Sequence, residues 1–356
     1  MRVAYTLEQC WHRVPGGTAS AALAVARRLT TRNDVELVGV SARHTHEPPP
    51  PWTPPIETRA LALPRTLLYD SWLRLRAPRV ERATGPVDVI HATTIIPPPR
   101  SVPLVVTIHD LAFLHEPGYF TARGRRVFRR SLDRVKQDAD LVLASSHATM
   151  RDCVEAGIAA DRLRHVPLGV TRTPVDASAV ATMRRRYGLE RHYLLFVGTL
   201  EPRKNLTRLV SAVDRLDTDH VLAVAGVDGW GGAAPPAEGR VRLLGFVSDR
   251  DRDALYAGAD AFVYPSLWEG FGLPVAEAMA HGTPVVTSRG TATEEVAGGA
   301  AVLVDPTDVD SIADGIGKAL ANSRGLISSG LARADELSWD HTAAATVAAY
   351  QEAAAT

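Results

Sequence analysis

The segment AFVYPSLWEGFGLPVAEAMAHGTPVVT, residues 261–287, predicts a strand, a glycine loop, a helix and a second strand. Its apolar runs at 261–264 and 284–287 are short and rich in β-formers, and Pro274 suits the first turn of the helix between them. Strand–helix–strand units are typical of parallel sheets that are covered by helices. The segment therefore predicts an α/β fold.

The same alternation continues through the whole chain. Strands are predicted at residues 2–5, 35–40, 87–91, 104–108, 141–144, 163–166, 193–197, 220–225, 241–244, 261–264, 284–287 and 301–304. Helices are predicted at residues 18–30, 122–139, 148–156, 175–187, 206–216, 249–258, 274–281 and 309–322. So many strands exceed one open sheet of ordinary size, so we predict two doubly wound, Rossmann-like domains with a cleft between them.

The border between the domains is predicted at residues 168–174, where glycine, proline and two threonines interrupt the pattern. We therefore expect a first domain over residues 1–170 and a second over 171–337. A last helix is expected within residues 338–356, opened by a serine.

Composition and charge exclude several classes of protein. The chain has 356 residues and a formal net charge of zero, so no overall field attracts nucleic acid. Cys10 and Cys153 form no CxxC or Cys/His pattern, which argues against a disulfide framework and a zinc site. No uncharged apolar run reaches the roughly 18 residues of a membrane span, and no signal peptide is recognisable. We expect a cytoplasmic protein with reduced thiols, and the sequence defines no oligomeric state.

Glu269 and Glu277 bracket the glycine loop of the opening segment. Gly270 and Gly272 let the backbone turn sharply, and the free amides of the following helix would point back at the loop and favour an anion. Ligands of open α/β sheets lie at the carboxyl ends of strands, where carboxylates can accept hydrogen bonds from sugar hydroxyls. The alternative is that Glu277 favours the helix N-terminus and Glu269 is solvated.

A second loop, VGTLEPRKN at residues 197–205, also follows a strand and opens a helix. Arg203 and Lys204 would lie beside a helix N-terminus, where cations are electrostatically unfavourable. Such a placement is understandable when both side chains face a bound diphosphate, because arginine offers a planar fork and lysine a point charge. The alternative is two solvated charges on a turn.

The first predicted domain offers weaker signals. Gly16 and Gly17 join an early loop to a helix, but the spacing of a dinucleotide fingerprint or a P-loop lysine is absent. His109 ends the strand at residues 104–108 and would therefore point into a carboxyl-end crevice. A structural role for this histidine is the alternative.

Two further stretches have ordinary explanations. The acidic run DRDRD at 249–253 could indicate a metal–nucleotide site, but it opens a predicted helix, where acids are common caps. The basic stretch at 123–136 contains interleaved apolar residues and could contact anionic lipid. We favour an amphipathic helix that covers the sheet, with weak peripheral membrane contact as the alternative.

Together, these motifs resemble the retaining glycosyltransferases of family 4, which have the GT-B fold. The most specific part spans residues 241–306, where Glu269 and Glu277 match the EX7E motif of the family. Further similar segments are VGTLEPRKNL at 197–206, TIHDLAFL at 107–114, SSHAT at 145–149 and VPLGV at 166–170. The resemblance covers most of the chain.

The resemblance implies a role for each matching residue. Glu277 would bind the ribose of a nucleotide-sugar donor, Arg203 and Lys204 would neutralise its diphosphate, and His109 would lie by the sugar at the reaction centre. Glu269 would hold the donor sugar together with the amides of the residues that follow it. The implied catalytic set is His109, Glu269, Arg203 and Lys204. The implied donor-binding set is Gly16, Gly17, Gly198, Thr199, Arg203, Lys204, Phe246, Glu269, Gly270, Phe271, Gly272, Leu273 and Glu277.

The chain also departs from the family pattern. Many relatives have arginine directly after the strand glycine, where this chain has Thr199, so Arg203 would supply the second cation. The stretch around Thr293 lacks a proline that often precedes the last glutamate. The GT-B likeness also implies that the helix from Trp339 crosses back to the first domain.

The expected reaction is the metal-independent transfer of a hexose from a nucleotide-diphosphate sugar, with no other cofactor. The motifs are closest to mannosyltransferase-like members, and GDP, UDP and dTDP all remain open. The acceptor would be a hydroxyl of a saccharide, a lipid-linked saccharide or an antibiotic oligosaccharide. Alternatives are a nucleotide-sugar epimerase, a pyridoxal-dependent phosphorylase and a sugar-binding protein. The phosphorylase is the least favoured, because this chain offers no suitable lysine for a Schiff base with pyridoxal phosphate.

Overall fold

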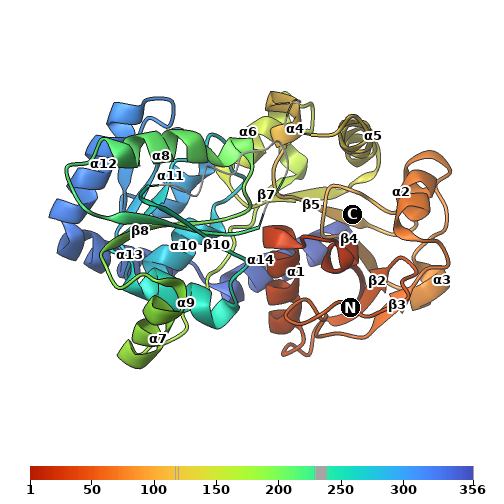
Figure 1. The fold of residues 1–356 in the computed structure, drawn as a ribbon. Helices are drawn as coiled ribbons and strands as arrows, with labels where there is room; N and C mark the ends of the chain where they lie inside the picture. Colours follow the sequence, from red (N-terminus) through yellow and green to blue (C-terminus); the bar gives the residue numbers. More distant parts are fainter. Residues whose placement is uncertain (117, 119, 228, 230–238, 356) are drawn as a thin grey trace. The chain divides into compact units, whose positions relative to one another are not determined.

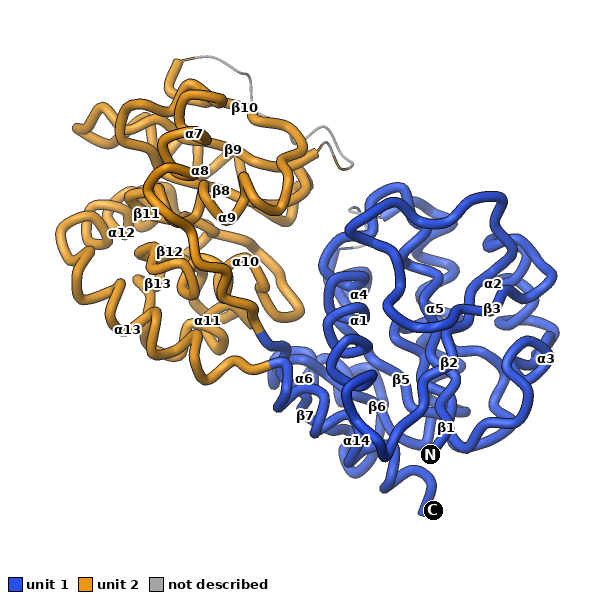
Figure 2. The backbone as a smooth tube through the Cα atoms, turned by 90° about the horizontal axis from the view of Figure 1, so that it is seen from below, with its two compact units in different colours: residues 1–169, 339–356 blue, residues 170–338 orange. Residues whose placement is uncertain are grey.

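Figure 1 shows the computed structural model, which describes residues 1–116, 118, 120–227, 229 and 239–355. The chain divides into two compact units (Figure 2). Unit 1 comprises residues 1–169 and 339–356, and unit 2 comprises residues 170–338. The borders predicted from the sequence each differ from these by one residue.

In the described part of unit 1, a seven-stranded parallel sheet has the order β3-β2-β1-β4-β5-β6-β7. Its strands are β1 (Arg2–Thr6), β2 (Glu36–Ser41), β3 (Thr58–Ala60), β4 (Val89–Ala92), β5 (Leu104–Ile108), β6 (Leu141–Ala144) and β7 (Leu163–His165). Its α-helices are α1 (Gly16–Leu29), α2 (Arg65–Arg74), α3 (Glu81–Thr84), α4 (Ala112–His115), α5 (Ala122–Asp138), α6 (His147–Glu155) and α14 (Trp339–Ala355). Short 3₁₀ turns lie at Glu8–Trp11 and Ala160–Arg162.

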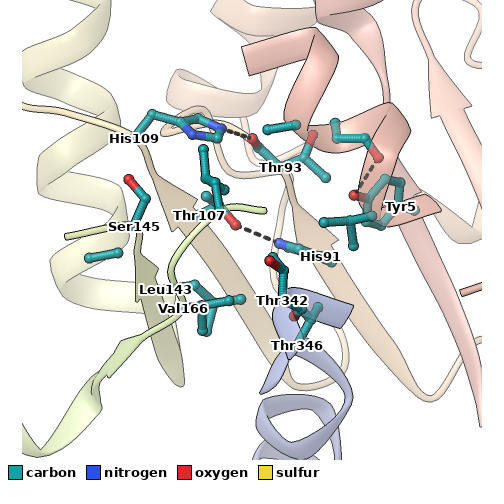
Figure 3. Close-up of a pocket in the computed structure, with 15 residues that line it drawn as sticks. Tyr5, His91, Thr93, Thr107, His109, Leu143, Ser145, Val166, Thr342 and Thr346 are labelled. Atoms are coloured by element: carbon teal, nitrogen blue, oxygen red, sulfur yellow. Dashed lines mark hydrogen bonds between the residues drawn. The ribbon is translucent and has the colours of Figure 1, made fainter. Parts of the chain in front are cut away.

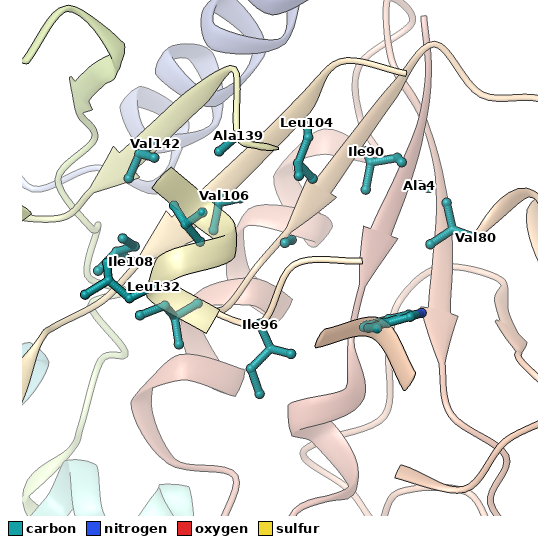
Figure 4. Close-up of a cluster of buried hydrophobic side chains, with 14 of the residues drawn as sticks. Ala4, Val80, Ile90, Ile96, Leu104, Val106, Ile108, Leu132, Ala139 and Val142 are labelled. Carbon is teal, nitrogen blue, oxygen red and sulfur yellow. The ribbon is translucent and has the colours of Figure 1, made fainter. Parts of the chain in front are cut away.

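Alternate strand residues of unit 1 face two different apolar layers. Ala4 of β1 belongs to a cluster that includes Leu104 and Val106 of β5 and Leu132 of α5 (Figure 4). Tyr5, the next residue of β1, packs instead with side chains of α1. This period of two, with apolar residues on both faces, is typical of a parallel strand that is buried between helices.

The last helix, α14, completes unit 1 rather than unit 2. It packs against α1 and against β4, β5 and β6. Tyr350 of α14 is fully buried, and its hydroxyl lies 2.7 Å from Nδ1 of His91 on β4. The hydroxyl of Thr342 donates a hydrogen bond to the carbonyl of Pro167 (2.7 Å). These contacts explain why residues distant in sequence share one core.

In the described part of unit 2, a six-stranded parallel sheet has the order β10-β9-β8-β11-β12-β13. Its strands are β8 (Tyr193–Val197), β9 (Val221–Ala225), β10 (Val241–Gly245), β11 (Ala261–Tyr264), β12 (Val285–Ser288) and β13 (Val302–Val304). Its α-helices are α7 (Ala177–Tyr187), α8 (Leu206–Asp214), α9 (Asp249–Gly258), α10 (Leu273–Ala280), α11 (Ala292–Ala297), α12 (Val309–Ala321) and α13 (Ser323–Glu336). A 3₁₀ turn at Pro202–Lys204 precedes α8.

The prediction of two parallel α/β sheets is confirmed. The edge strand β3 was missed because it has three residues, none of them fully buried, and no apolar alternation. Helices α2, α3, α4, α11 and α13 were also missed. The acidic run at the start of α9 has the predicted capping arrangement, in which Ser248 accepts a hydrogen bond from the amide of Asp251 (3.2 Å).

The basic helix α5 covers the sheet of unit 1. Leu132 and Val135 are buried in the core cluster, and Val127 and Phe128 pack against it. The apolar residues that suggested lipid contact therefore pack against the protein core. A contact with lipid would have to be made by the charged side chains of this helix. Within the described residues, no helix has the length and apolar character needed to cross a membrane.

Candidate active site

The sheet of unit 2 brings the two predicted loops together. Strands β8 and β11 are paired neighbours, so the loop after Val197 and the loop after Tyr264 leave the same edge. Asn205 joins them: its side-chain amide donates to the carbonyls of Pro265 (2.9 Å) and Pro306 (2.6 Å). Its backbone is left-handed, with φ of 62°, a conformation that asparagine tolerates better than most residues.

An ionic cluster occupies this edge. Glu269 accepts hydrogen bonds at Oε1 from Lys204 Nζ (2.5 Å) and Ser266 Oγ (2.6 Å), and at Oε2 from Arg203 Nη1 (3.0 Å). Arg203 also donates through Nε to Glu201 (2.8 Å). The structure therefore brings together three of the four predicted catalytic residues.

The cluster is largely removed from water. Lys204 is 6 % exposed and Glu269 is 9 % exposed. Burial alone would raise the pKa of Glu269, but the charges of Arg203 and Lys204, with hydrogen bonds from Lys204 and Ser266, hold that pKa at about 2. Burial and the neighbouring Arg203 lower the pKa of Lys204, which Glu269 opposes. Glu269 is thus a carboxylate at neutral pH, positioned by its cations.

The glycine loop requires glycine at position 272. Gly272 has φ of 105°, and a Cβ there would come within 2.7 Å of the Thr293 side chain. Thr293 is fully buried and hydrogen-bonded to Thr287 (2.8 Å), so it supports the loop from beneath. Among the described residues, no side chain caps the start of α10, which follows Gly272. Pro274 has no amide hydrogen, and the amides of Val275 and Ala276 donate to the Gly272 carbonyl, so the Leu273 amide is the one at this end that is suited to a ligand.

Glu277, the second EX7E glutamate, has a different environment. It lies on α10, is half-buried, and accepts a hydrogen bond from the Tyr256 hydroxyl (3.0 Å). Burial raises the pKa of Glu277 above its usual value, although the charge of Arg252 opposes the rise. The pKa of Glu269 is therefore below the usual value for glutamate and that of Glu277 is above it, which indicates separate roles for the two glutamates of the motif.

The other predicted residues of unit 2 surround the same edge. The Thr199 hydroxyl donates to Glu201 (2.6 Å), so the position that holds arginine in many relatives supports the cluster. Gly198 lies so close to Gly226 that a Cβ on Gly226 would be 1.9 Å from the Gly198 carbonyl oxygen. Phe246 follows β10 and is 73 % exposed. Their roles in donor binding stay predictions.

His109, the fourth predicted catalytic residue, lies in unit 1 directly after β5. Its Nε2 donates a hydrogen bond to the carbonyl of Thr93 (3.1 Å) (Figure 3). Burial lowers the pKa of His109, and the bond to Thr93 only partly opposes this. The ring is therefore neutral at neutral pH, with its proton on Nε2.

A buried polar network holds Thr93 in place. Gln9 donates to the Thr93 hydroxyl (2.7 Å), and the Thr93 amide donates to the Thr6 hydroxyl (3.0 Å). All three side chains are buried. Sequence reasoning missed these residues, because nothing in their spacing connects them to His109.

The cavity beside His109 is lined mostly by small apolar and hydroxyl-bearing side chains (Figure 3). His91 lies at its wall, with Nε2 2.8 Å from the Thr107 hydroxyl and Nδ1 against Tyr350. Burial lowers the pKa of His91 to about 3, so this histidine is neutral. The cavity is therefore neutral and mainly apolar, with most of its hydroxyls bonded within the protein.

The structure corrects the prediction for Gly16 and Gly17. They were predicted to form a loop that precedes a helix beginning at Thr18. Instead they are the first two residues of α1, and Gly16 has φ of 63°. The positive φ explains the glycine at position 16, while a role of Gly16 and Gly17 in donor binding stays a prediction.

Two parallel α/β sheets, together with an ion-paired EX7E glutamate at the carboxyl edge of the second, define a GT-B glycosyltransferase. A solved structure with this fold, the Anabaena protein HepE in complex with UDP and glucose, aligns over 99 % of this chain and 98 % of its own, with a TM-score of 0.74 and 19 % identity. Residues 15–173 match the family described as "Glycosyltransferase Family 4", and residues 191–322 match "Glycosyl transferases group 1". The chain belongs to glycosyltransferase family 4, so the family predicted from the sequence is confirmed.

Curated relatives include two mannosyltransferases. The O-antigen chain mannosyltransferase B of Escherichia coli is 34 % identical over 284 residues, which cover 74 % of this chain and 74 % of that protein. The GDP-mannose-dependent alpha-(1-6)-phosphatidylinositol monomannoside mannosyltransferase of Mycolicibacterium smegmatis is 34 % identical over 58 % of this chain and 59 % of its own length. The chain is thus a retaining glycosyltransferase with a nucleotide-sugar donor, as its motifs predicted.

Proposed function

We propose that this protein is a GDP-mannose-dependent mannosyltransferase. The observation that carries the proposal is the 34 % identity with a mannosyltransferase over three quarters of both chains. A second relative, whose name specifies GDP-mannose as donor, supports the choice of nucleotide. The acceptor is a hydroxyl of a saccharide or a lipid-linked saccharide, the two classes that these relatives' names suggest. Neither of these two relatives' names supports the antibiotic acceptor that the sequence left open.

Unit 2 binds the donor at the edge that holds the ionic cluster. Glu277 accepts hydrogen bonds from the ribose, and Glu269 and the amides of residues 270–273 hold the sugar hydroxyls. The diphosphate approaches Arg203 and Lys204, whose charges the carboxylates of Glu201 and Glu269 keep in place. This pre-formed arrangement supports the proposal because little reorganisation is needed when the diphosphate binds.

The chemical step develops negative charge on the leaving diphosphate. Arg203 and Lys204 stabilise that charge, and removal of one such group costs about 10²–10³-fold in turnover. The acceptor hydroxyl attacks the anomeric carbon on the face from which GDP leaves, so the configuration is retained. Its proton passes to the departing phosphate oxygen as the glycosidic bond breaks. The two cations supply the charge that a metal ion would otherwise supply, so the mechanism includes no metal.

His109 contributes from unit 1 as a neutral hydrogen-bonding group. Its proton is held on Nε2 by the Thr93 carbonyl, which leaves Nδ1 as an acceptor for a hydroxyl of the transferred sugar. This role positions the reacting sugar without moving a proton.

The donor is tested by thermal shift with GDP-mannose, UDP-glucose, a dTDP-sugar and the free nucleotides. GDP-mannose is expected to give the largest rise in Tm, because a ligand at 100 times its Kd adds about 2.7 kcal/mol to the stability of the folded state. A larger rise with a UDP- or dTDP-sugar would overturn the choice of GDP-mannose. A rise with free mannose alone would instead support the sugar-binding alternative.

The reaction class is tested by incubating the protein with GDP-mannose, with and without a mannose-containing acceptor. Acceptor-dependent release of GDP and an α-linked product are expected. Isomerised donor in the absence of acceptor would favour the epimerase alternative.

Weak membrane contact through the charged side chains of α5 is a subsidiary proposal. Sedimentation with anionic vesicles at low and high salt would test it, since such contact weakens with salt.

A further inference from the structure

Three side chains gather at the amino edge of the unit 2 sheet, the edge opposite the ionic cluster. His192 directly precedes β8, His220 directly precedes β9, and Asp260 directly precedes β11. These strands are neighbours in the order β9-β8-β11. Because all of them are parallel, their first residues lie together although they are distant in sequence.

The distances are those of a ligand set. Nδ1 of His192 lies 3.0 Å from Oδ1 of Asp260, and Nε2 of His220 lies 3.8 Å from Oδ2 of the same carboxylate. One donor atom from each residue lies within 4.8 Å of the other two. Ligand atoms about 2.0–2.1 Å from one tetrahedral zinc ion are separated by roughly 3.3–3.4 Å, so small side-chain rotations would close the set on an ion.

Two features prepare the cluster for a ligand. The amide of Tyr193 donates to Oδ2 of Asp260 (2.9 Å), which fixes the carboxylate and leaves Oδ1 directed toward His192. The His220 side chain is 14 % exposed, and its Nδ1 is buried without a hydrogen-bond partner among the described residues. The nitrogen that faces Asp260 is Nε2, which lies 3.8 Å from the carboxylate, too far for a hydrogen bond, so coordination through Nε2 would give this half-buried ring a partner.

We propose that His192, His220 and Asp260 bind one divalent transition-metal ion of the zinc type, with water completing the coordination. Two imidazoles and a carboxylate match the ligand preference of Zn²⁺ and its neighbours. The ion would join the beginnings of β8, β9 and β11, and so stabilise unit 2 from the edge opposite the donor. It takes no part in the transfer reaction, so the inference is independent of the proposed function.

This inference departs from the sequence expectation of no metal site. That expectation rested on the absence of closely spaced Cys/His motifs, whereas the present residues meet only through strand order. The competing explanation is an ion pair between His192 and Asp260 beside an unrelated His220, with no affinity for metals.

The test is calorimetric titration of ZnCl₂ into tag-free, chelator-treated protein, with Co²⁺ absorption as a second readout. Wild type is expected to bind one ion per chain and to gain Tm on binding. His220→Ala and Asp260→Asn are expected to weaken that binding at least tenfold and to lose the Tm gain. His46→Ala, which removes an exposed histidine of unit 1, is the matched control and is expected to bind like wild type.

Failure of wild type to show saturable binding, or equal affinity in His220→Ala and Asp260→Asn, would overturn the proposal. If these two variants do not fold, His192→Ala replaces them, because its imidazole is 70 % exposed and its loss leaves the core intact. Unchanged affinity in that variant would likewise overturn the proposal. Binding of GDP-mannose in metal-free buffer is expected to be the same in all folded variants.

Discussion

The carboxyl edges of the two sheets differ in the charge of the side chains that they hold. In unit 2, the edge holds buried charges: Glu269 lies between Arg203 and Lys204, and Glu201 lies on the far side of Arg203. In unit 1, His109 at the corresponding edge is neutral, and the Thr93 carbonyl fixes it beside a mainly apolar cavity. The same sheet architecture thus supports an ionic site and a neutral one.

The difference follows the chemistry proposed for each unit. A diphosphate carries charge and needs cations, which are costly to bury unless carboxylates accompany them. A sugar hydroxyl carries no charge and needs well-directed hydrogen bonds, which a neutral imidazole and a fixed carbonyl provide. Substitutions in the ionic cluster of unit 2 should therefore alter both stability and turnover, whereas substitution of His109 in unit 1 should alter turnover with little loss of stability.

The largest effect is expected from Glu269→Gln. It leaves Lys204 as a buried cation without its carboxylate, so the free energy of unfolding should fall by about 3–5 kcal/mol. Turnover should fall about 10²–10³-fold, because the positions of both cations depend on Glu269. Urea unfolding and steady-state transfer rates measure the two effects.

The double variant Lys204→Met/Glu269→Gln separates these effects. It removes both charges, so stability should return most of the way to wild type while turnover stays low. A double variant as unstable as Glu269→Gln, or one that regains activity, would contradict the ionic account of this edge.

A smaller effect, confined to turnover, is expected from His109→Ala. We expect kcat to fall about a hundredfold, with the midpoint of urea unfolding close to wild type, since the ring makes one hydrogen bond to the backbone. Thr93→Val, which removes the hydroxyl bonded by Gln9 but keeps the carbonyl, should lower kcat about tenfold and stability by about 1–3 kcal/mol, because the buried Gln9 amide loses its acceptor. Loss of stability comparable with that of Glu269→Gln would remove the contrast between the units.

The pH dependence of His109 gives a further check on the same residue. Because its pKa lies below the usual 6.5, kcat should be level near neutral pH and fall only at lower pH, as protonation of Nδ1 removes the acceptor. A fall in kcat that begins above pH 6.5 in wild type and is absent in His109→Ala would show that the ring is not the neutral group described above.

The smallest effect concerns the two glutamates of unit 2. The raised pKa of Glu277 means that it gains a proton above the usual 4.5, so affinity for GDP-mannose should fall as the pH is lowered from about 7 to about 5, by at most tenfold per pH unit. Glu269 stays ionised, since its stabilising contribution is present above pH 4.5 and is lost only as the pH falls toward about 2. Calorimetry with the sugar nucleotide is suitable, because free GDP has a phosphate that titrates in this range.

Glu277→Gln is the control for that prediction. Its affinity should be lower at neutral pH and independent of pH over the same range. If the pH dependence of wild type persists in Glu277→Gln, another group binds the ribose.

The sequence predicted the sheets and the ionic loops because their signals are local. Buried parallel strands such as residues 104–108 and 261–264 were placed at their observed limits, since apolar runs with clear borders define them. Arg203, Lys204 and Glu269 were found through glycine loops that follow strands. In each case, the neighbours in sequence are also the neighbours that decide the structure.

The remaining site residues could not be predicted in this way. Gln9, Thr6 and Thr93 meet only because β1 and β4 are adjacent in the sheet, and a polar residue near a strand end has many possible partners. Thr293, which lies in the stretch that lacks the family's proline, is a buried support for Gly272, a role that depends on the fold around α11. Such contacts depend on the order of strands, which local patterns do not specify.

The return of α14 to unit 1 has a consequence for synthesis on the ribosome. Residues 170–338 form a continuous unit that can fold as soon as they have emerged, whereas residues 1–169 lack the helix that supplies Tyr350 and Thr342. At roughly 5–20 residues per second, the first half of the chain must wait for roughly 10–35 s before its final helix is made. The half that is translated first is therefore the half that is finished last.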